Sequence, residues 1–92
     1  MRVYKFRGRS FDTGEYVYGD LIQGDNGVYI KRWEDGVEVE VDNDTIAQLV
    51  GLDKNGREVY EGDWVKTPFK EEPVQVSMTS IYTVHEYELV AA

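Results

Sequence analysis

Three dipeptides that favour tight hairpin turns divide this chain: Asn26-Gly27, Asp35-Gly36 and Asn55-Gly56. A type I′ turn requires positive φ at both central residues, and Asn or Asp followed by Gly adopts it at low cost. Between the turns apolar and polar residues alternate, as in residues 37–41, where valines alternate with glutamates. Alternation with period two is typical of a strand with one buried face. The pattern therefore predicts short antiparallel strands joined by tight turns.

The same pattern places the individual strands. We predict them over residues 3–7, 15–22, 28–33, 37–41, 48–51, 58–60 and 63–67, followed by a final hairpin that pairs 74–79 with 81–90. The second strand is expected to bend near Gly19. One short helical turn is predicted at residues 43–46, which Asn43 or Asp44 would cap. Short strands at this spacing indicate a mainly β fold, a small antiparallel sheet that is curled or closed into a barrel.

The length of 92 residues fits one domain, because a second core would not fit in so short a chain. We expect residues 1–67 to form the β core. Residues 68–92 would form a C-terminal loop and hairpin of the same domain. Pro68 and Pro73 bracket the exposed loop between the two parts.

Composition excludes several kinds of function. Eighteen acidic and ten basic residues give a net charge of −8, which opposes binding to nucleic acid or to an anionic membrane. The chain has no cysteine and one histidine, so a disulfide framework, a thiol nucleophile and a multi-histidine metal site are excluded. No apolar leader or membrane-length apolar run is present, and the expected location is the cytoplasm.

Acidic pairs are the nearest approach to a catalytic or metal site. Glu38 and Glu40 lie two residues apart, as do Asp42 and Asp44, and a hydrolase or a divalent-cation site uses such pairs. A solvated strand face that blocks edge-to-edge aggregation is the simpler interpretation. His85 and Glu86 would point to opposite faces of a strand. We therefore predict no enzyme activity and no catalytic, cofactor-binding or metal-binding residues.

Basic residues are concentrated at the start of the chain, at Arg2, Lys5, Arg7 and Arg9. This strand would present a narrow basic stripe for phosphates or RNA. Alternatively, its charges pair with the acidic residues 38–44 in the same barrel or in a neighbouring subunit, which we favour. The seven tyrosines suggest a protein interface wherever they gather on one surface.

Three stretches together resemble the YopX-like family of small phage and prophage proteins. These are Lys-Phe-Arg-Gly at 5–8 with Tyr-Gly-Asp-Leu at 18–21, then residues 46–52, and the run Asp-Lys-Asn-Gly-Arg-Glu-Val-Tyr-Glu-Gly-Asp-Trp-Val at 53–65. The resemblance covers residues 1–67. It implies a mainly β protein carried by bacterial phages, with members that assemble as homo-oligomers. It brings no established activity and no catalytic residues.

The residue types in the run at 53–65, the family motif, indicate a structural role. Asn55 and Gly56 would form a hairpin turn, Gly62 a further turn, and Asp63 would accept backbone hydrogen bonds there. Tyr60 is expected in the core. The first functional hypothesis is thus a phage accessory protein that binds itself or an unknown phage or host protein in the bacterial cytoplasm. The second is a small nucleic-acid-binding barrel, since residues 62–66 resemble a strand opening of RNA-binding barrels. Membrane binding is not expected, and nucleic acid is disfavoured by charge.

Overall fold

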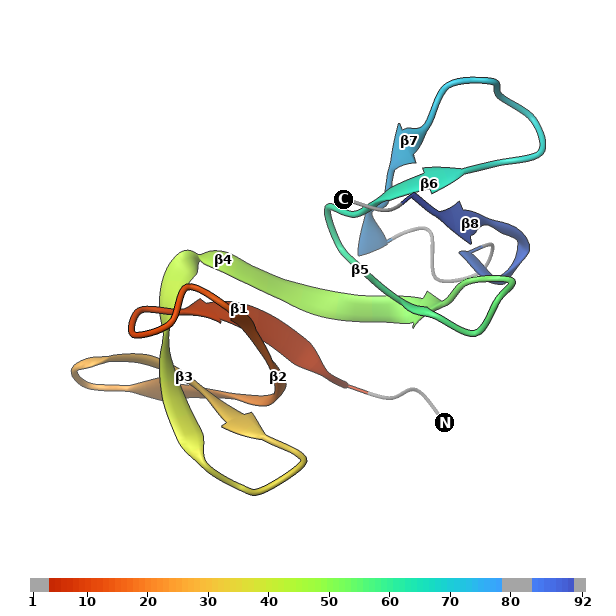
Figure 1. Cartoon of the computed structure of the whole chain (residues 1–92). Helices are drawn as coiled ribbons and strands as arrows, with labels where there is room; N and C mark the ends of the chain where they lie inside the picture. Colours follow the sequence, from red (N-terminus) through yellow and green to blue (C-terminus); the bar gives the residue numbers. More distant parts are fainter. Residues whose placement is uncertain (1–3, 79–83, 91–92) are drawn as a thin grey trace. The chain divides into compact units, whose positions relative to one another are not determined.

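The computed structural model describes residues 4–78 and 84–90 (Figure 1). Their elements in chain order are β1 (Phe6–Ser10), β2 (Tyr16–Gly24), β3 (Gly27–Arg32), β4 (Glu38–Leu52), β5 (Glu58–Tyr60), β6 (Trp64–Lys66), β7 (Val74–Gln75), the 3-10 turn η2 (Val84–Glu86) and β8 (Glu88–Leu89). The prediction of a mainly β fold is confirmed. The chain forms two compact units, residues 1–48 and 49–92. The expected division after residue 67 therefore falls within the second unit.

The first unit is a small closed barrel. Strands β1 to β4 pair in sequence order, every pair is antiparallel, and β1 also pairs with β4 (Figure 1). Ile30 and Val41 are fully or almost fully buried inside it. A Cβ atom at Gly8 would lie 2.8 Å from Cγ2 of Val41, so the narrow interior leaves no room for a side chain there.

Gly19 marks the predicted bend in β2. Residues before it pair with β1, up to the Phe6–Gly19 pair, and residues after it pair with β3 from the Gly19–Arg32 pair onward. A Cβ atom at Gly19 would lie 2.0 Å from the Lys31 carbonyl oxygen. Glycine is required because the two strand backbones approach too closely for any side chain.

The helical turn predicted at residues 43–46 is wrong, because these residues belong to β4. The register between β1 and β4 shifts here, from Arg7–Ala47 to Arg9–Asp42, so the intervening residues form a wide irregularity. The Thr45 hydroxyl accepts a hydrogen bond from Arg9 N at 2.8 Å and donates one to the Asp42 carbonyl at 2.7 Å. Such side-chain bonds to backbone groups replace those of a helix. A helical turn forms instead at η2.

Hairpin turns form at or next to the three predicted dipeptides but not as type I′ turns. The first is made by Asp25 and Asn26, one residue earlier than predicted, because Gly27 already pairs with Gly24 in β3. No non-glycine residue of the described chain has positive φ, so Asn26, Asp35 and Asn55 do not adopt the conformation that type I′ requires. Gly36 and Gly56 do have positive φ, at 74° and 80°. Around Gly56 the backbone N–H of Asp53 donates to the Arg57 carbonyl at 2.8 Å and encloses a three-residue loop. Loops of this length end in a left-handed residue, usually glycine.

The second unit has its own apolar core. Its buried members are Val50, Val59, Val65, Val76 and Val84. Here β6 lies between β7 and β8 (Figure 1). The predicted hairpin of 74–79 with 81–90 is therefore wrong in its pairing, while residues 79–83 lie outside the described residues. Val84 is buried in η2, and the chain then runs back along β6 rather than along β7.

Candidate functional site

The basic residues of the N-terminal stripe lie on the outside of the barrel. In β1 the buried Gly8 and Ser10 alternate with Arg7 and Arg9, as the period of a strand requires. Lys5 precedes the strand on the same alternation. Arg2 lies outside the described residues. Strand β2 places Tyr18 opposite Arg7 and Tyr16 opposite Arg9 in register.

The cations contact aromatic rings. The Lys5 ammonium lies 4.9 Å from the centre of the Trp33 ring and 5.9 Å from that of Tyr18, and the Arg7 guanidinium carbon lies 5.0 Å from that of Tyr16. Each exposed contact of this kind contributes about 0.5–1 kcal/mol. The three rings remain 41–50% exposed. We call this surface the cation–aromatic face; it comprises Lys5, Arg7, Arg9, Tyr16, Tyr18 and Trp33.

Hydrogen bonds fix two members of this face. The indole N–H of Trp33 donates to a carboxylate oxygen of Asp20 at 2.9 Å, which orients the ring. The Nε of Arg9 donates to the Gly14 carbonyl at 2.7 Å, in the turn between β1 and β2. These bonds hold rings and cations in place before any partner arrives, which lowers the entropic cost of binding.

The acidic residues of β4 form a second charged surface, which we call the acidic face; it comprises Glu38, Glu40 and Asp42. Val39 and Val41 between them point inward, and Val41 is buried. In register Lys31 stands opposite Glu38, Tyr29 opposite Glu40, and Arg9 opposite Asp42. We expected the basic residues of β1 to pair with residues 38–44 of the same barrel. The strand register places one such pair, Arg9 and Asp42, opposite each other, and the rest of this expectation stays a prediction.

The residues of the family motif lie in the second unit and build its turns. Asp63 closes the turn before β6: its carboxylate accepts a hydrogen bond from Tyr60 N at 2.8 Å, and its own N–H donates to the Tyr60 carbonyl at 3.0 Å. Gly62 has a φ of 91° in that turn. Tyr60 is 2% exposed, and its hydroxyl donates to Glu58 at 2.9 Å. The motif therefore organises backbone and core.

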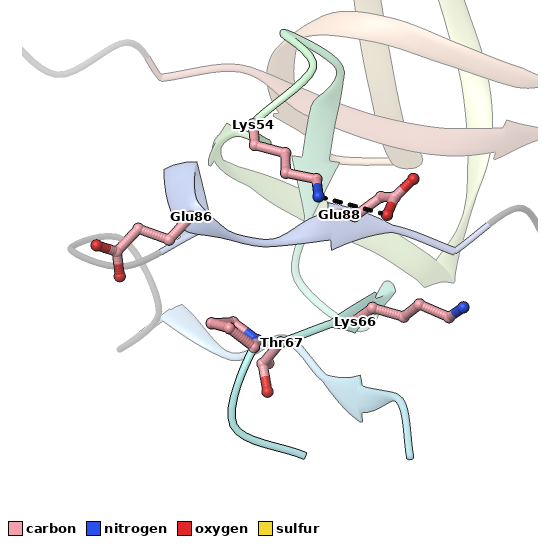
Figure 2. A pocket seen from close by; sticks show the side chains of 6 residues that line it. Lys54, Lys66, Thr67, Glu86 and Glu88 are labelled. Atoms are coloured by element: carbon pink, nitrogen blue, oxygen red, sulfur yellow. Dashed lines mark ion pairs between the residues drawn. The ribbon is translucent and has the colours of Figure 1, made fainter. Parts of the chain in front are cut away.

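An open hollow of about 230 Å³ lies on the second unit. Its lining residues, shown in Figure 2, are Lys54, Lys66, Thr67, Pro68, Glu86 and Glu88. The Lys54 ammonium lies 3.7 Å from a Glu88 carboxylate oxygen, and both side chains are about half exposed. Two acids and two bases nearly cancel in charge, so the hollow shows no preference for an anion or a cation.

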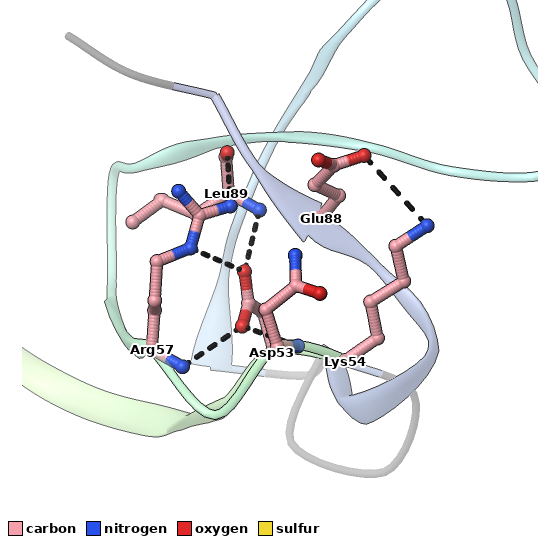
Figure 3. Close-up of polar contacts among 6 residues, drawn as sticks. Asp53, Lys54, Arg57, Glu88 and Leu89 are labelled. Atoms are coloured by element: carbon pink, nitrogen blue, oxygen red, sulfur yellow. Dashed lines mark hydrogen bonds and ion pairs between the residues drawn. The ribbon is translucent and has the colours of Figure 1, made fainter.

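Asp53 is the polar centre that the sequence did not reveal (Figure 3). Its carboxylate is fully buried. One oxygen accepts from the backbone N–H groups of Asn55 and Arg57, both at 2.9 Å. The other accepts from Leu89 N at 2.9 Å and from the Arg57 guanidinium at 3.1 Å. The carboxylate thus joins the 53–57 turn to β8.

These contacts change the acidity of Asp53. Burial by itself raises the pKa of the carboxyl group, but hydrogen bonds from the backbones of Leu89, Arg57 and Asn55 and from the Arg57 side chain outweigh it and lower the pKa to about 2. The sequence offered one indication, since Asp favours the first position of a turn. The bond to Leu89 joins residues far apart in the chain and has no local sequence pattern.

Within the described residues, no group of three or more histidine, cysteine or acidic side chains is placed to hold a metal ion. His85 is exposed in η2. No helix in the described part of the chain is long and apolar enough to cross a membrane.

Comparisons of the chain with protein-family models, with curated proteins and with solved structures find no match. The resemblance to the YopX-like family is therefore a prediction that stands on the sequence motifs of residues 1–67.

Proposed function

We propose that this protein is a non-enzymatic binding module that acts by protein–protein contact, self-association included. The observation that carries the proposal is the cation–aromatic face, where Tyr16, Tyr18 and Trp33 are each 41–50% exposed on one side of the barrel. Tyrosine, tryptophan and arginine are the residues that contribute most to binding energy at protein interfaces. If the family resemblance holds, the module is a phage or prophage accessory protein with a phage or host partner.

A second candidate is binding of single-stranded nucleic acid at the same face. Cations beside exposed rings match the way such proteins hold phosphates and stack bases. The surrounding charge opposes it, because residues 1–48 contain ten acidic and six basic residues. This charge favours a protein partner. To bind nucleic acid, the stacking rings and the few cations would have to overcome the repulsion between the acidic residues and the phosphates.

The experiment is a measurement of solution mass by light scattering over a wide range of protein concentration. We expect the mass to rise above that of the 10.6 kDa monomer. The double variant Tyr18→Ser with Trp33→Ser should reduce the rise. The matched control is Phe69→Ser, which removes an 80% exposed ring in the second unit. A monomeric wild type at every concentration, together with micromolar binding of an oligonucleotide, would favour the second candidate.

A further inference from the structure

The barrel carries opposite charges on different strand pairs. The cation–aromatic face belongs to β1 and β2, with Trp33 just after β3, whereas the acidic face belongs to β4 beside β3. Both sets of charges occupy alternate positions of a strand, so each repeats every two residues, or about 6.8 Å. Three cations at 5, 7 and 9 and three acids at 38, 40 and 42 thus have the same spacing and the same length.

We call the cations at 5, 7 and 9 the basic row and the acids at 38, 40 and 42 the acidic row. The strand register gives the neighbours of the central residue of each row. Arg7 lies between Tyr18 on β2 and Ala47 on β4. Glu40 lies opposite Tyr29 on β3 and is exposed. At the ends of the rows, by contrast, Arg9 faces Asp42 and Lys31 faces Glu38. The register therefore sets opposite charges against each other within the barrel at these end positions.

We propose that the cation–aromatic face of one copy docks on the acidic face of a second copy. This rests on the proposed function and names its partner. The net charge of −8 makes copies of the chain repel one another in most orientations. The orientation that sets the basic row of one against the acidic row of the other is attractive, and the rings beside the cations supply apolar contact.

The test uses two charge reversals and their mixture. Arg7→Glu removes the centre of the basic row, and Glu40→Lys removes the centre of the acidic row. Each variant alone should lower the association constant at least about tenfold in sedimentation velocity at protein concentrations up to about 1 mM. An equimolar mixture should recover association, because the positions that are reversed in the two variants again carry opposite charges. The Arg7→Glu copy still has its acidic face, and the Glu40→Lys copy still has its basic face.

Glu40→Lys separates docking from general repulsion. It makes the chain less negative than −8, so weaker repulsion alone predicts stronger association, whereas docking predicts weaker association. Lys70→Glu, at an exposed position of the second unit, is the matched control for Arg7→Glu and should have little effect. Circular dichroism establishes that each variant is folded. A salt series on the wild type needs no variant, and raising salt from about 0.1 to 1 M should weaken association as the screening length falls from about 10 to 3 Å.

The outcomes separate this inference from the proposed function. Association of the wild type that is insensitive to salt and to both reversals overturns the docking of these faces, while protein contact itself survives. If the wild type associates but the mixture of the two variants does not, the docking of these faces is likewise overturned. A wild type that stays monomeric at all concentrations overturns the docking of these faces and, within the proposed function, self-association. Tight binding of a single-stranded oligonucleotide that Arg7→Glu abolishes, with solution mass unaffected by either reversal, assigns the face to nucleic acid instead.

Discussion

Replacing Asp53 by Asn should strongly destabilise the second unit. The carboxylate accepts four hydrogen bonds, two at each oxygen. The amide of Asn keeps one oxygen. Its NH₂ group takes the place of the second oxygen and would face the two donors there, Leu89 N and Arg57 Nε. Two hydrogen bonds to a charged acceptor are then lost, and Leu89 N is left buried without an acceptor. We expect the free energy of unfolding at neutral pH to fall by roughly 3 kcal/mol.

The pH dependence gives an independent measure of the same contacts. The pKa of Asp53 lies at about 2 in the folded chain, below its ordinary value of 3.8. Ionisation therefore contributes roughly 2 kcal/mol of stability at neutral pH. Because the folded pKa is the lower one, this contribution is complete above the unfolded pKa and is lost as pH falls through about 2. The difference between wild type and Asp53→Asn should shrink accordingly as the solution is acidified.

The assay is urea denaturation at several pH values, followed by fluorescence in a Trp33→Phe background so that Trp64 of the second unit reports. The matched control is Asp25→Asn, at an exposed position in the turn between β2 and β3. If Asp53→Asn and Asp25→Asn have the same stability within about 0.5 kcal/mol, the buried carboxylate does not hold the turn to β8 and the reasoning fails.

Three further predictions concern the turns, the barrel interior and nucleic acid. Gly56→Val should lower stability by about 1–2 kcal/mol, because a β-branched side chain resists the φ of 80°, and an unchanged melting temperature would contradict this. Gly8→Ala should cost about 1–3 kcal/mol, because the added Cβ would lie 2.8 Å from Val41. A second substitution, Val41→Ala, should give less than additive loss in a double-mutant cycle. Duplex DNA should not bind appreciably at about 0.15 M salt in an anisotropy titration, and micromolar binding that is lost when Arg7 and Arg9 become Glu would refute this.

Local patterns predicted most of the strands, but β1 covers Phe6–Ser10 rather than residues 3–7, and the segments predicted at 37–41 and 48–51 belong to the single strand β4. Alternation over 37–41 reappears in the N-terminal part of β4, and the run at 58–60 coincides with β5. The bend at Gly19 followed from a glycine within an alternating strand, and its cause is the close approach to the Lys31 carbonyl. The alternation and the glycine within it are local sequence patterns, which is why these features could be predicted.

Features that depend on distant partners were not predictable in this way. Residues 43–46 have helix-capping residues, but their conformation is decided by the bond between Thr45 and the backbone of Arg9 on another strand. The choice of β6 as partner for both β7 and β8 likewise depends on tertiary packing around Val65 and Val84. At the candidate site the basic row was predicted, whereas its contacts with Tyr16, Tyr18 and Trp33 follow from the pairing of β1 with β2 and of β2 with β3.

The most direct test of the central claim is a dilution series of amide ¹H–¹⁵N spectra. It reports residue by residue which surface enters a contact between copies. Concentration-dependent shifts should gather at residues 5–9 and 16–18 of the cation–aromatic face and at 38–42 of the acidic face. Spectra that do not change with concentration, or changes confined to residues 49–90 of the second unit, would contradict binding through the barrel.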